Sequence, residues 1–138
     1  MRAKTVEMIK RVKSLLVDHE YMKSRELAEK CGLCVGSICR IIRLMREEGI
    51  GILSTKNGYV LSKYAKKPDD VGFLRRLHGR RASDFVALQA AQADIKRRWR
   101  SIEDRKQLQL ICSPLTANVG RLQAGMKVLL KRSNNKGL

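Results

Sequence analysis

Residues 24–50 have the sequence SRELAEKCGLCVGSICRIIRLMREEGI, and this stretch decides the fold. Ser24 is typical of a helix N-cap and Gly32 of a helix end, since glycine enters the left-handed conformation without steric cost. A short helix is therefore predicted over 25–31. A further helix is predicted over 35–48, where apolar residues recur on one narrow face and Gly49 follows as the stop. That apolar face holds Ile38, Ile41, Ile42 and Met45, and the opposite face holds Gly36, Cys39, Arg40 and Arg43.

An amphipathic helix precedes this stretch and a β-hairpin follows it. Apolar residues recur at helical spacing from Val6 to Leu16, which predicts a helix over 4–18. Residues 50–54 and 59–61 are strand-like, and Asn57-Gly58 between them favours a tight turn because both positions tolerate positive φ. Three helices followed by a hairpin, in this order, predict a winged helix–turn–helix.

The quoted residues also carry a family resemblance. Residues 27–34, 37–43 and 46–50, with the Gly-Tyr-Val-Leu ending at 58–61, resemble the winged-helix domains of bacterial repressors of the biotin-repressor and DeoR types. The resemblance covers residues 4–62 and implies that helix 35–48 enters the major groove of double-stranded DNA.

One departure from that family pattern concerns the start of the recognition helix. The families usually place Ser or Thr at its cap and polar residues just after, whereas this chain has Cys34, Val35 and Gly36. We therefore expect DNA binding to depend less on hydrogen bonds at the helix terminus and more on Arg40, Arg43 and the wing.

The second half of the chain predicts further helices. Pro68 and two aspartates favour a hinge over 63–72, and Ser83 is a candidate N-cap for a helix extending to Trp99. Another helix is predicted over 102–111, and an apolar stripe over 115–129 suits either intramolecular packing or a coiled-coil seam. The chain from Cys31 aligns without gaps onto the chain from Cys112, so a degenerate second helix–turn–helix is an alternative there.

Together these patterns predict a mainly α fold with a small β-wing. A winged helix–turn–helix domain over 1–62 would be followed by the hinge and by a basic helical domain over 73–138. That last domain would serve self-association, additional DNA contact, or both.

Charge is the strongest global signal. The net charge is +17, with 12 Lys and Arg against 7 Asp and Glu in residues 1–62, and 18 against 6 in residues 63–138. Such a field favours a polyanionic partner. Aromatic residues make up only 4% of the chain, which argues against stacking on single-stranded nucleic acid.

The candidate DNA-binding residues follow from these patterns. Arg40 and Arg43 suit bidentate contacts to guanine in the major groove, the alternative being a solvated helix face that pairs with Glu47. The clusters Arg75–Arg81 and Lys96–Arg100 suit either phosphate contact or solubility. The full candidate set is Gly36, Ser37, Cys39, Arg40, Arg43, Lys56, Lys23, Arg25, Arg80, Arg81, Arg97 and Arg98.

The four cysteines raise a metal hypothesis. Cys31 and Cys34 have zinc-ligand spacing, but a structural site normally shows a second close pair, and only the solitary Cys112 lies outside this segment. Cys31 suits a small core position instead, so no metal and no cofactor are predicted. The chain also lacks paired carboxylates in a polar setting, a glycine-rich phosphate loop and a nucleophile–base pair, so we do not expect an enzyme.

The sequence therefore predicts a double-stranded DNA-binding transcriptional regulator, a repressor of bacterial or phage origin. The alternatives are a replication-initiation or DNA-packaging assembly factor and a protein–protein adaptor. A homodimer or higher homo-oligomer is expected. No apolar run is long enough for a membrane span, and the start of the chain lacks a secretory signal, so a cytoplasmic location is expected.

Overall fold

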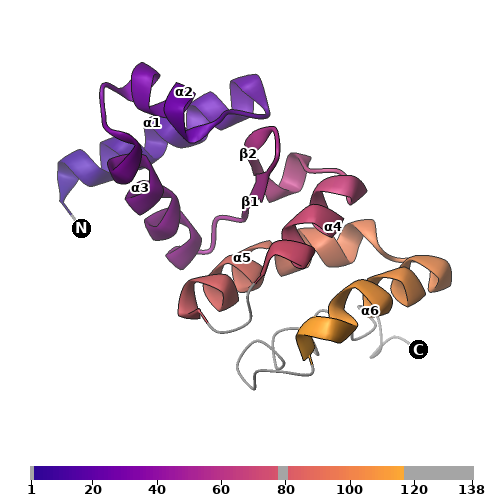
Figure 1. Ribbon diagram of the computed structural model, residues 1–138. Coiled ribbons are helices and arrows are strands. Elements are labelled where there is room, and N and C mark those ends of the chain that lie inside the picture. Colours follow the sequence, from indigo (N-terminus) through magenta and orange to yellow (C-terminus); the bar gives the residue numbers. More distant parts are fainter. Residues whose placement is uncertain (1, 78–80, 117–138) are drawn as a thin grey trace.

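The computed structural model describes residues 2–77 and 81–116 as a mainly helical protein with one small hairpin (Figure 1). The elements are α1 (Ala3–His19), α2 (Ser24–Cys31), α3 (Val35–Glu47), β1 (Ile52–Thr55), β2 (Gly58–Leu61), the 3₁₀ turn η1 (Ser62–Tyr64), α4 (Lys67–Arg76), α5 (Ala82–Arg98) and α6 (Ile102–Thr116). The predicted order of three helices and then an antiparallel hairpin is confirmed.

Helices α1 to α3 form within about two residues of the predicted bounds because their apolar faces meet in one core. α2 ends at Gly32, whose φ of 65° is left-handed as expected. Its N-cap, however, is Lys23 rather than Ser24, and the Lys23 N–H donates to Glu26 Oε1 at 3.2 Å. The buried residues of this first core are Ile9, Val12, Leu16, Met22, Leu27, Ala28, Ile38, Ile41, Ile42, Met45, Ile52 and Leu61.

The hairpin turn differs from the predicted one. Only Gly58 has positive φ (118°), while Asn57 does not, and the Thr55 hydroxyl donates to the Gly58 carbonyl at 2.8 Å. The backbone of Met22 also lies so close that only glycine fits at position 58, since a Cβ there would be 2.4 Å from the Met22 carbonyl carbon. Met22 forms a backbone bridge to Tyr59 in β2, which fixes the hairpin to the loop before α2.

The hinge predicted over 63–72 is corrected by the structure, which has helix α4 from Lys67 to Arg76. Pro68 falls in the first turn of α4, where a missing N–H removes no intrahelical hydrogen bond. The Lys66 N–H donates to Asp69 Oδ2 at 2.9 Å and caps the helix start. The two aspartates thus support a helix here instead of a flexible linker.

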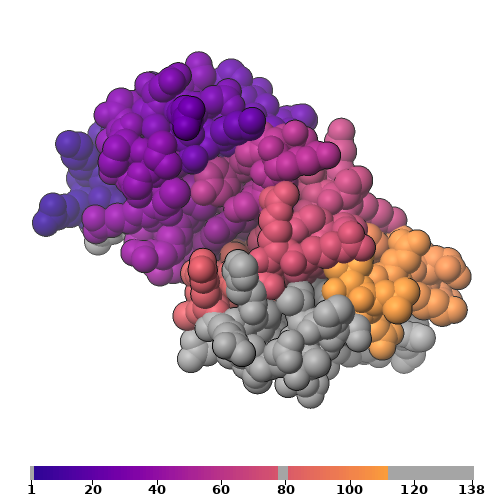
Figure 2. All heavy atoms as spheres, viewed as in Figure 1, coloured from indigo at the N-terminus to yellow at the C-terminus, as the bar shows by residue number. Residues whose placement is uncertain are grey.

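The hairpin lies between two hydrophobic cores (Figure 1). The cross-strand pair Ile52 and Leu61 faces the first core, and the next pair, Leu53 and Val60, faces a second core built from α4, α5 and α6. Successive residues of a strand point to opposite faces, so one short hairpin serves both cores. In the space-filling view α1–α3 and α6 lie at opposite ends of one continuous body (Figure 2).

A buried polar network joins the elements of the second core. Asp70 is completely buried and accepts hydrogen bonds from Arg98 Nε and Nη2, both at 2.7 Å, and from Trp99 Nε1 at 2.8 Å. Arg98 Nη1 also donates to the Ser62 carbonyl at 2.6 Å, and the Ser62 hydroxyl bonds to Asp94. The network therefore ties α4 and α5 to the end of the hairpin.

The later helices also depart from their predicted ends. Arg81, not Ser83, is the N-cap of α5, and α6 continues through Ser113-Pro114 to Thr116 instead of ending at 111. The apolar stripe up to 129 and most of the repeat that begins at Cys112 lie outside the described residues. No helix within residues 2–77 and 81–116 is long and apolar enough to cross a membrane.

Candidate nucleic-acid interface

Helix α3 separates its side chains as its 3.6-residue period requires. Ile38, Ile41, Ile42 and Met45 are buried in the first core, and the residues on the opposite face are exposed. Ser37, at the edge of that face, is half-buried. The exposed members of the predicted set on this helix are Gly36, Cys39, Arg40 and Arg43.

The N-cap residue of α3 is Cys34. Cys34 is exposed, and its Sγ lies 3.3 Å from the Ser37 hydroxyl oxygen, in hydrogen-bond contact. Hydrogen bonds from the Ser37 hydroxyl and from backbone N–H groups lower the pKa of the Cys34 thiol. This thiol thus occupies the position where the resembled families place Ser or Thr.

A groove runs between α3 and the first turns of α5. It has a volume of about 450 Å³ and is lined by Tyr59 of β2 and by residues of both helices that include Arg40, Arg43, Arg46, Ser83 and Val86. We call it the α3–α5 groove. Arg46, Tyr59, Ser83 and Val86 were absent from the predicted set. No local sequence signal tells which residues of β2 and α5 lie beside α3.

Arg46 connects the groove to the hairpin. Its guanidinium donates to the Ile52 carbonyl at 2.7 and 3.1 Å and to the Ser54 hydroxyl at 3.2 Å. Burial lowers the pKa of Arg46. Among the described residues its hydrogen bonds go to neutral oxygens, so its positive charge has no bonded carboxylate there.

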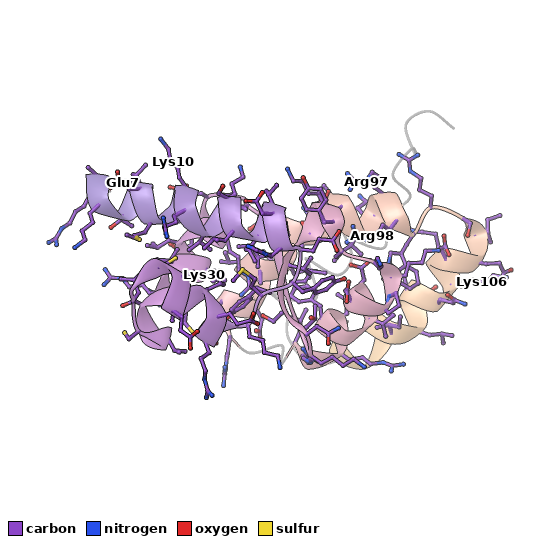
Figure 3. All side chains as sticks on the ribbon, turned by 90° about the horizontal axis from the view of Figure 1, so that it is seen from above. Glu7, Lys10, Lys30, Arg97, Arg98 and Lys106 are labelled. Atoms are coloured by element: carbon purple, nitrogen blue, oxygen red, sulfur yellow. The ribbon has the colours of Figure 1, made fainter. Side chains whose placement is uncertain are left out.

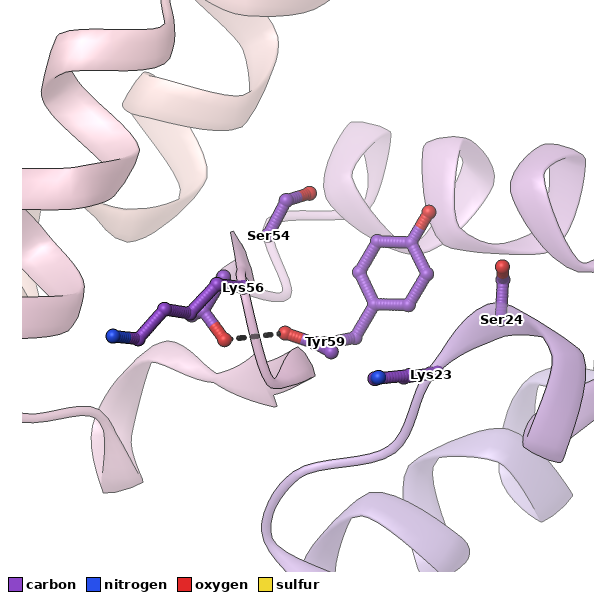
Figure 4. A pocket seen from close by; sticks show the side chains of 7 residues that line it. Lys23, Ser24, Ser54, Lys56 and Tyr59 are labelled. Atoms are coloured by element: carbon purple, nitrogen blue, oxygen red, sulfur yellow. Dashed lines mark hydrogen bonds between the residues drawn. The ribbon is translucent and has the colours of Figure 1, made fainter.

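A second pocket, of about 330 Å³, lies between the start of α2 and the hairpin (Figure 4). Tyr59 lines this pocket as well as the α3–α5 groove, and its hydroxyl lies 4.0 Å from Cys39 Sγ. Burial raises the pKa of Tyr59. The other lining residues are Lys23, Ser24, Ser54, Thr55, Lys56 and Gly58.

Apart from Arg98, the remaining predicted residues fall into three groups. Lys23, Arg25 and Lys56 are exposed around the second pocket and the start of α2, and Arg81 is exposed at the N-cap of α5. Arg97 is exposed and pairs with Asp94 at 2.9 Å. Arg80 lies outside the described residues.

The structure corrects the predicted role of Arg98 in DNA binding. It is only 14% exposed and forms the bidentate ion pair with Asp70, so its guanidinium points inward while Arg97 stands at the edge (Figure 3). A phosphate could reach Arg98 only by breaking that buried pair, which is strongly unfavourable. We therefore remove Arg98 from the candidate DNA-binding set.

Cys31, Cys34 and Cys39 are free thiols, and within residues 2–77 and 81–116 no three His, Cys, Asp or Glu side chains gather as a metal site would need.

Comparisons of the chain with protein-family models, with curated proteins and with solved structures found no match. The resemblance to bacterial repressors therefore stays a prediction from the quoted residues.

Proposed function

We propose that this protein binds double-stranded DNA and regulates transcription as a repressor of bacterial or phage type. The observation that carries the proposal is the exposed face of α3, where Arg40 and Arg43 stand opposite a fully buried apolar face. The major groove of B-DNA is about 12 Å wide and admits one α-helix, so a helix with this division of side chains can dock there.

Each basic group has a distinct task in the proposed complex. Arg40 and Arg43 donate bidentate hydrogen bonds to guanine O6 and N7, which discriminates between base pairs. Lys23, Arg25 and Lys56 contact phosphates, which fixes the orientation of the protein on the duplex without reading sequence. Lys56 is exposed in the turn between β1 and β2, which supports this role.

The net charge of +17 supports the same partner. Each phosphate that is neutralised releases condensed counterions, so affinity for DNA falls with salt in proportion to the number of phosphate contacts. We further propose that the protein acts in the cytoplasm and binds as a homodimer, because two copies double both the base contacts and the phosphate contacts. Sedimentation at micromolar concentration measures the dimer directly.

Selection of bound duplexes from a random pool tests the proposed function. We expect a short enriched sequence containing guanines, bound with nanomolar affinity at near-physiological salt. The matched control is Arg40→Ala with Arg43→Ala, which should enrich no sequence while retaining salt-sensitive binding. A wild-type protein that enriches no sequence contradicts a regulator that reads DNA.

A further inference from the structure

Strand β1 has an edge that pairs with no strand, since the sheet within the described residues has two strands. In an antiparallel pair, opposite residues alternate between those that bond to each other and those whose backbone groups point outward. Tyr59 belongs to the outward class, because its N–H and its C=O both bond to Met22, at 2.8 and 3.1 Å. Its partner Ser54 therefore turns its own backbone groups to the open edge of β1, and Ile52, two residues earlier, does the same.

Two arginines from different helices bind these outward carbonyls. Arg46 of α3 donates to the Ile52 carbonyl at 2.7 and 3.1 Å and to the Ser54 hydroxyl at 3.2 Å. Arg76, in the last turn of α4, donates to the Ser54 carbonyl at 3.1 Å. We call Arg46 and Arg76 the arginine pair. Because α3 packs in the first core and α4 in the second, the arginine pair bonds β1 to both cores.

Hydrogen bonding replaces packing toward the turn of the hairpin. The first two residues of β1 and the last two of β2 are buried, whereas the strand residues nearest the turn are half-buried. The contacts at Ser54 therefore lie where the apolar packing ends. Lys56 follows two residues later, so its Cα lies within about 7 Å of the Ser54 Cα. Contacts at Ser54 thus restrict the turn that carries Lys56 more directly than the buried residues do.

Arginine is suited to such positioning, because its guanidinium is planar and presents its donors in a rigid fork. Arg46 directs Nε and Nη2 to one carbonyl, which fixes both the distance and the direction between α3 and β1. A lysine would keep the charge but not this geometry, since its ammonium is a point charge on a flexible stem. The charge of Arg46 and its geometry can therefore be separated by experiment.

We propose, on the basis of the DNA-binding function above, that Arg46 and Arg76 are positioning residues for the hairpin turn. They set the angle between the turn and α3, so that Lys56 meets a phosphate while Arg40 and Arg43 read bases. Because Arg76 comes from α4, the phosphate contact of the turn depends on a residue of the second core. The second half of the chain then acts on DNA binding through geometry as well as through charge.

The test measures how the effect of Lys56→Ala on DNA binding depends on the arginine pair. Lys56→Ala is made in the wild-type protein and in three backgrounds, and affinity for the selected duplex is followed by fluorescence anisotropy across a salt series. The backgrounds are Arg46→Lys, Arg76→Ala and, as the matched control, Arg75→Ala. Arg75 is exposed in the same turn of α4 and, within the described part of the chain, makes no hydrogen bond to the hairpin. Arg76 is exposed as well, so its variant folds and decides the test even where Arg46→Lys does not fold.

In the wild-type protein, Lys56→Ala should flatten the slope of log affinity against log salt by roughly 0.9, which is the loss of one phosphate contact. In Arg46→Lys and in Arg76→Ala the same substitution should change the slope by less than about half of that, because a displaced turn no longer brings Lys56 to the phosphate. In Arg75→Ala it should keep its full effect. Preference for the selected over a random duplex should persist in Arg76→Ala, whereas a general loss of structure would remove both.

The failures are distinguishable. Equal effects of Lys56→Ala in every background, or no effect in the wild-type protein, overturn the positioning role and leave the proposed function standing. If only one folded background weakens the effect of Lys56→Ala, the arginine pair as proposed is wrong. A wild-type protein that prefers no duplex contradicts the proposed function itself, and the positioning role fails with it.

Discussion

Cys34 illustrates how one residue departs from a family pattern while keeping its geometry. It takes the N-cap position of α3 with extended backbone, and its thiol lies beside Ser37. A thiolate is the reactive form of cysteine, and a lowered pKa increases its fraction at neutral pH. We therefore expect Cys34 to react faster with electrophiles than a cysteine whose pKa is not lowered.

Removing the hydroxyl of Ser37 should slow the reaction of Cys34. In Ser37→Ala the pKa of the Cys34 thiol rises toward its ordinary value, because the largest cause of its lowering is lost. We expect slower alkylation of Cys34 at pH 7, measured by mass spectrometry of the peptide that contains it. Ser14→Ala, an exposed serine on α1, is the control. An unchanged rate in Ser37→Ala would show that the hydroxyl does not stabilise the thiolate.

Single residues were predictable where helix periodicity decides their place. The buried and exposed faces of α3 follow from the spacing of its apolar residues alone, and the structure confirms that division. The burial of Arg98 was not predictable, since its partner Asp70 lies 28 residues away and belongs to a stretch that looked like a hinge. A basic run gives no sign of which member faces inward.

At the scale of elements, the β-hairpin was predictable in place but not in its surroundings. Strand-like residues and a turn signal located it correctly, whereas its second packing face depends on helices that follow later in the chain. Gly51, just before β1, shows how close these helices come. A Cβ at Gly51 would lie 2.0 Å from Ser62 Oγ and 2.9 Å from the Ala90 carbonyl oxygen of α5.

Gly51→Ala should therefore destabilise the protein, by on the order of 2–3 kcal/mol, because the backbone oxygen of α5 cannot move alone. Gly72→Ala is the matched control: nothing lies within 4 Å of its added Cβ, and α4 gains helix propensity of roughly 0.5–1 kcal/mol. Urea unfolding measures both changes. Equal stability of the two variants would mean that α5 does not pack against β1 as described.

At the scale of the whole molecule, the hairpin contributes buried residues to both cores, so we expect the two cores to unfold as one cooperative unit. A separate domain over 1–62 was predicted from its three helices, its wing and the family resemblance, with a hinge after it. In place of that hinge, α4 packs against the hairpin in the second core, where Phe73 and Leu74 lie with Leu53 and Val60. Cutting the chain after residue 62 would expose Leu53 and Val60, which are both fully buried. Local periodicity cannot reveal such sharing, because it does not report which elements meet in space.

Asp70→Asn should lower the stability of both cores together. It leaves Arg98 buried without a carboxylate, which costs about 3–5 kcal/mol. Trp99 fluorescence follows the second core and hydrogen exchange of α1–α3 follows the first, and both should shift to the same lower denaturant concentration. Asp104→Asn, which removes the more exposed pair with Lys67, should change stability far less. A shift confined to the fluorescence signal would refute a single cooperative unit.

The measurement that tests the proposed function most directly is the ratio of affinities for the selected duplex and for a random duplex. Arg40→Ala and Arg43→Ala should each lower the free energy of discrimination that this ratio measures by about 1–3 kcal/mol. Their affinity for the random duplex should stay close to that of a charge-matched control. Lys10→Ala and Lys13→Ala provide that control, since both lysines are exposed on α1, with Lys10 at its outer edge (Figure 3). Equal losses on the two duplexes would show that these arginines touch only phosphate and would contradict α3 as the recognition helix.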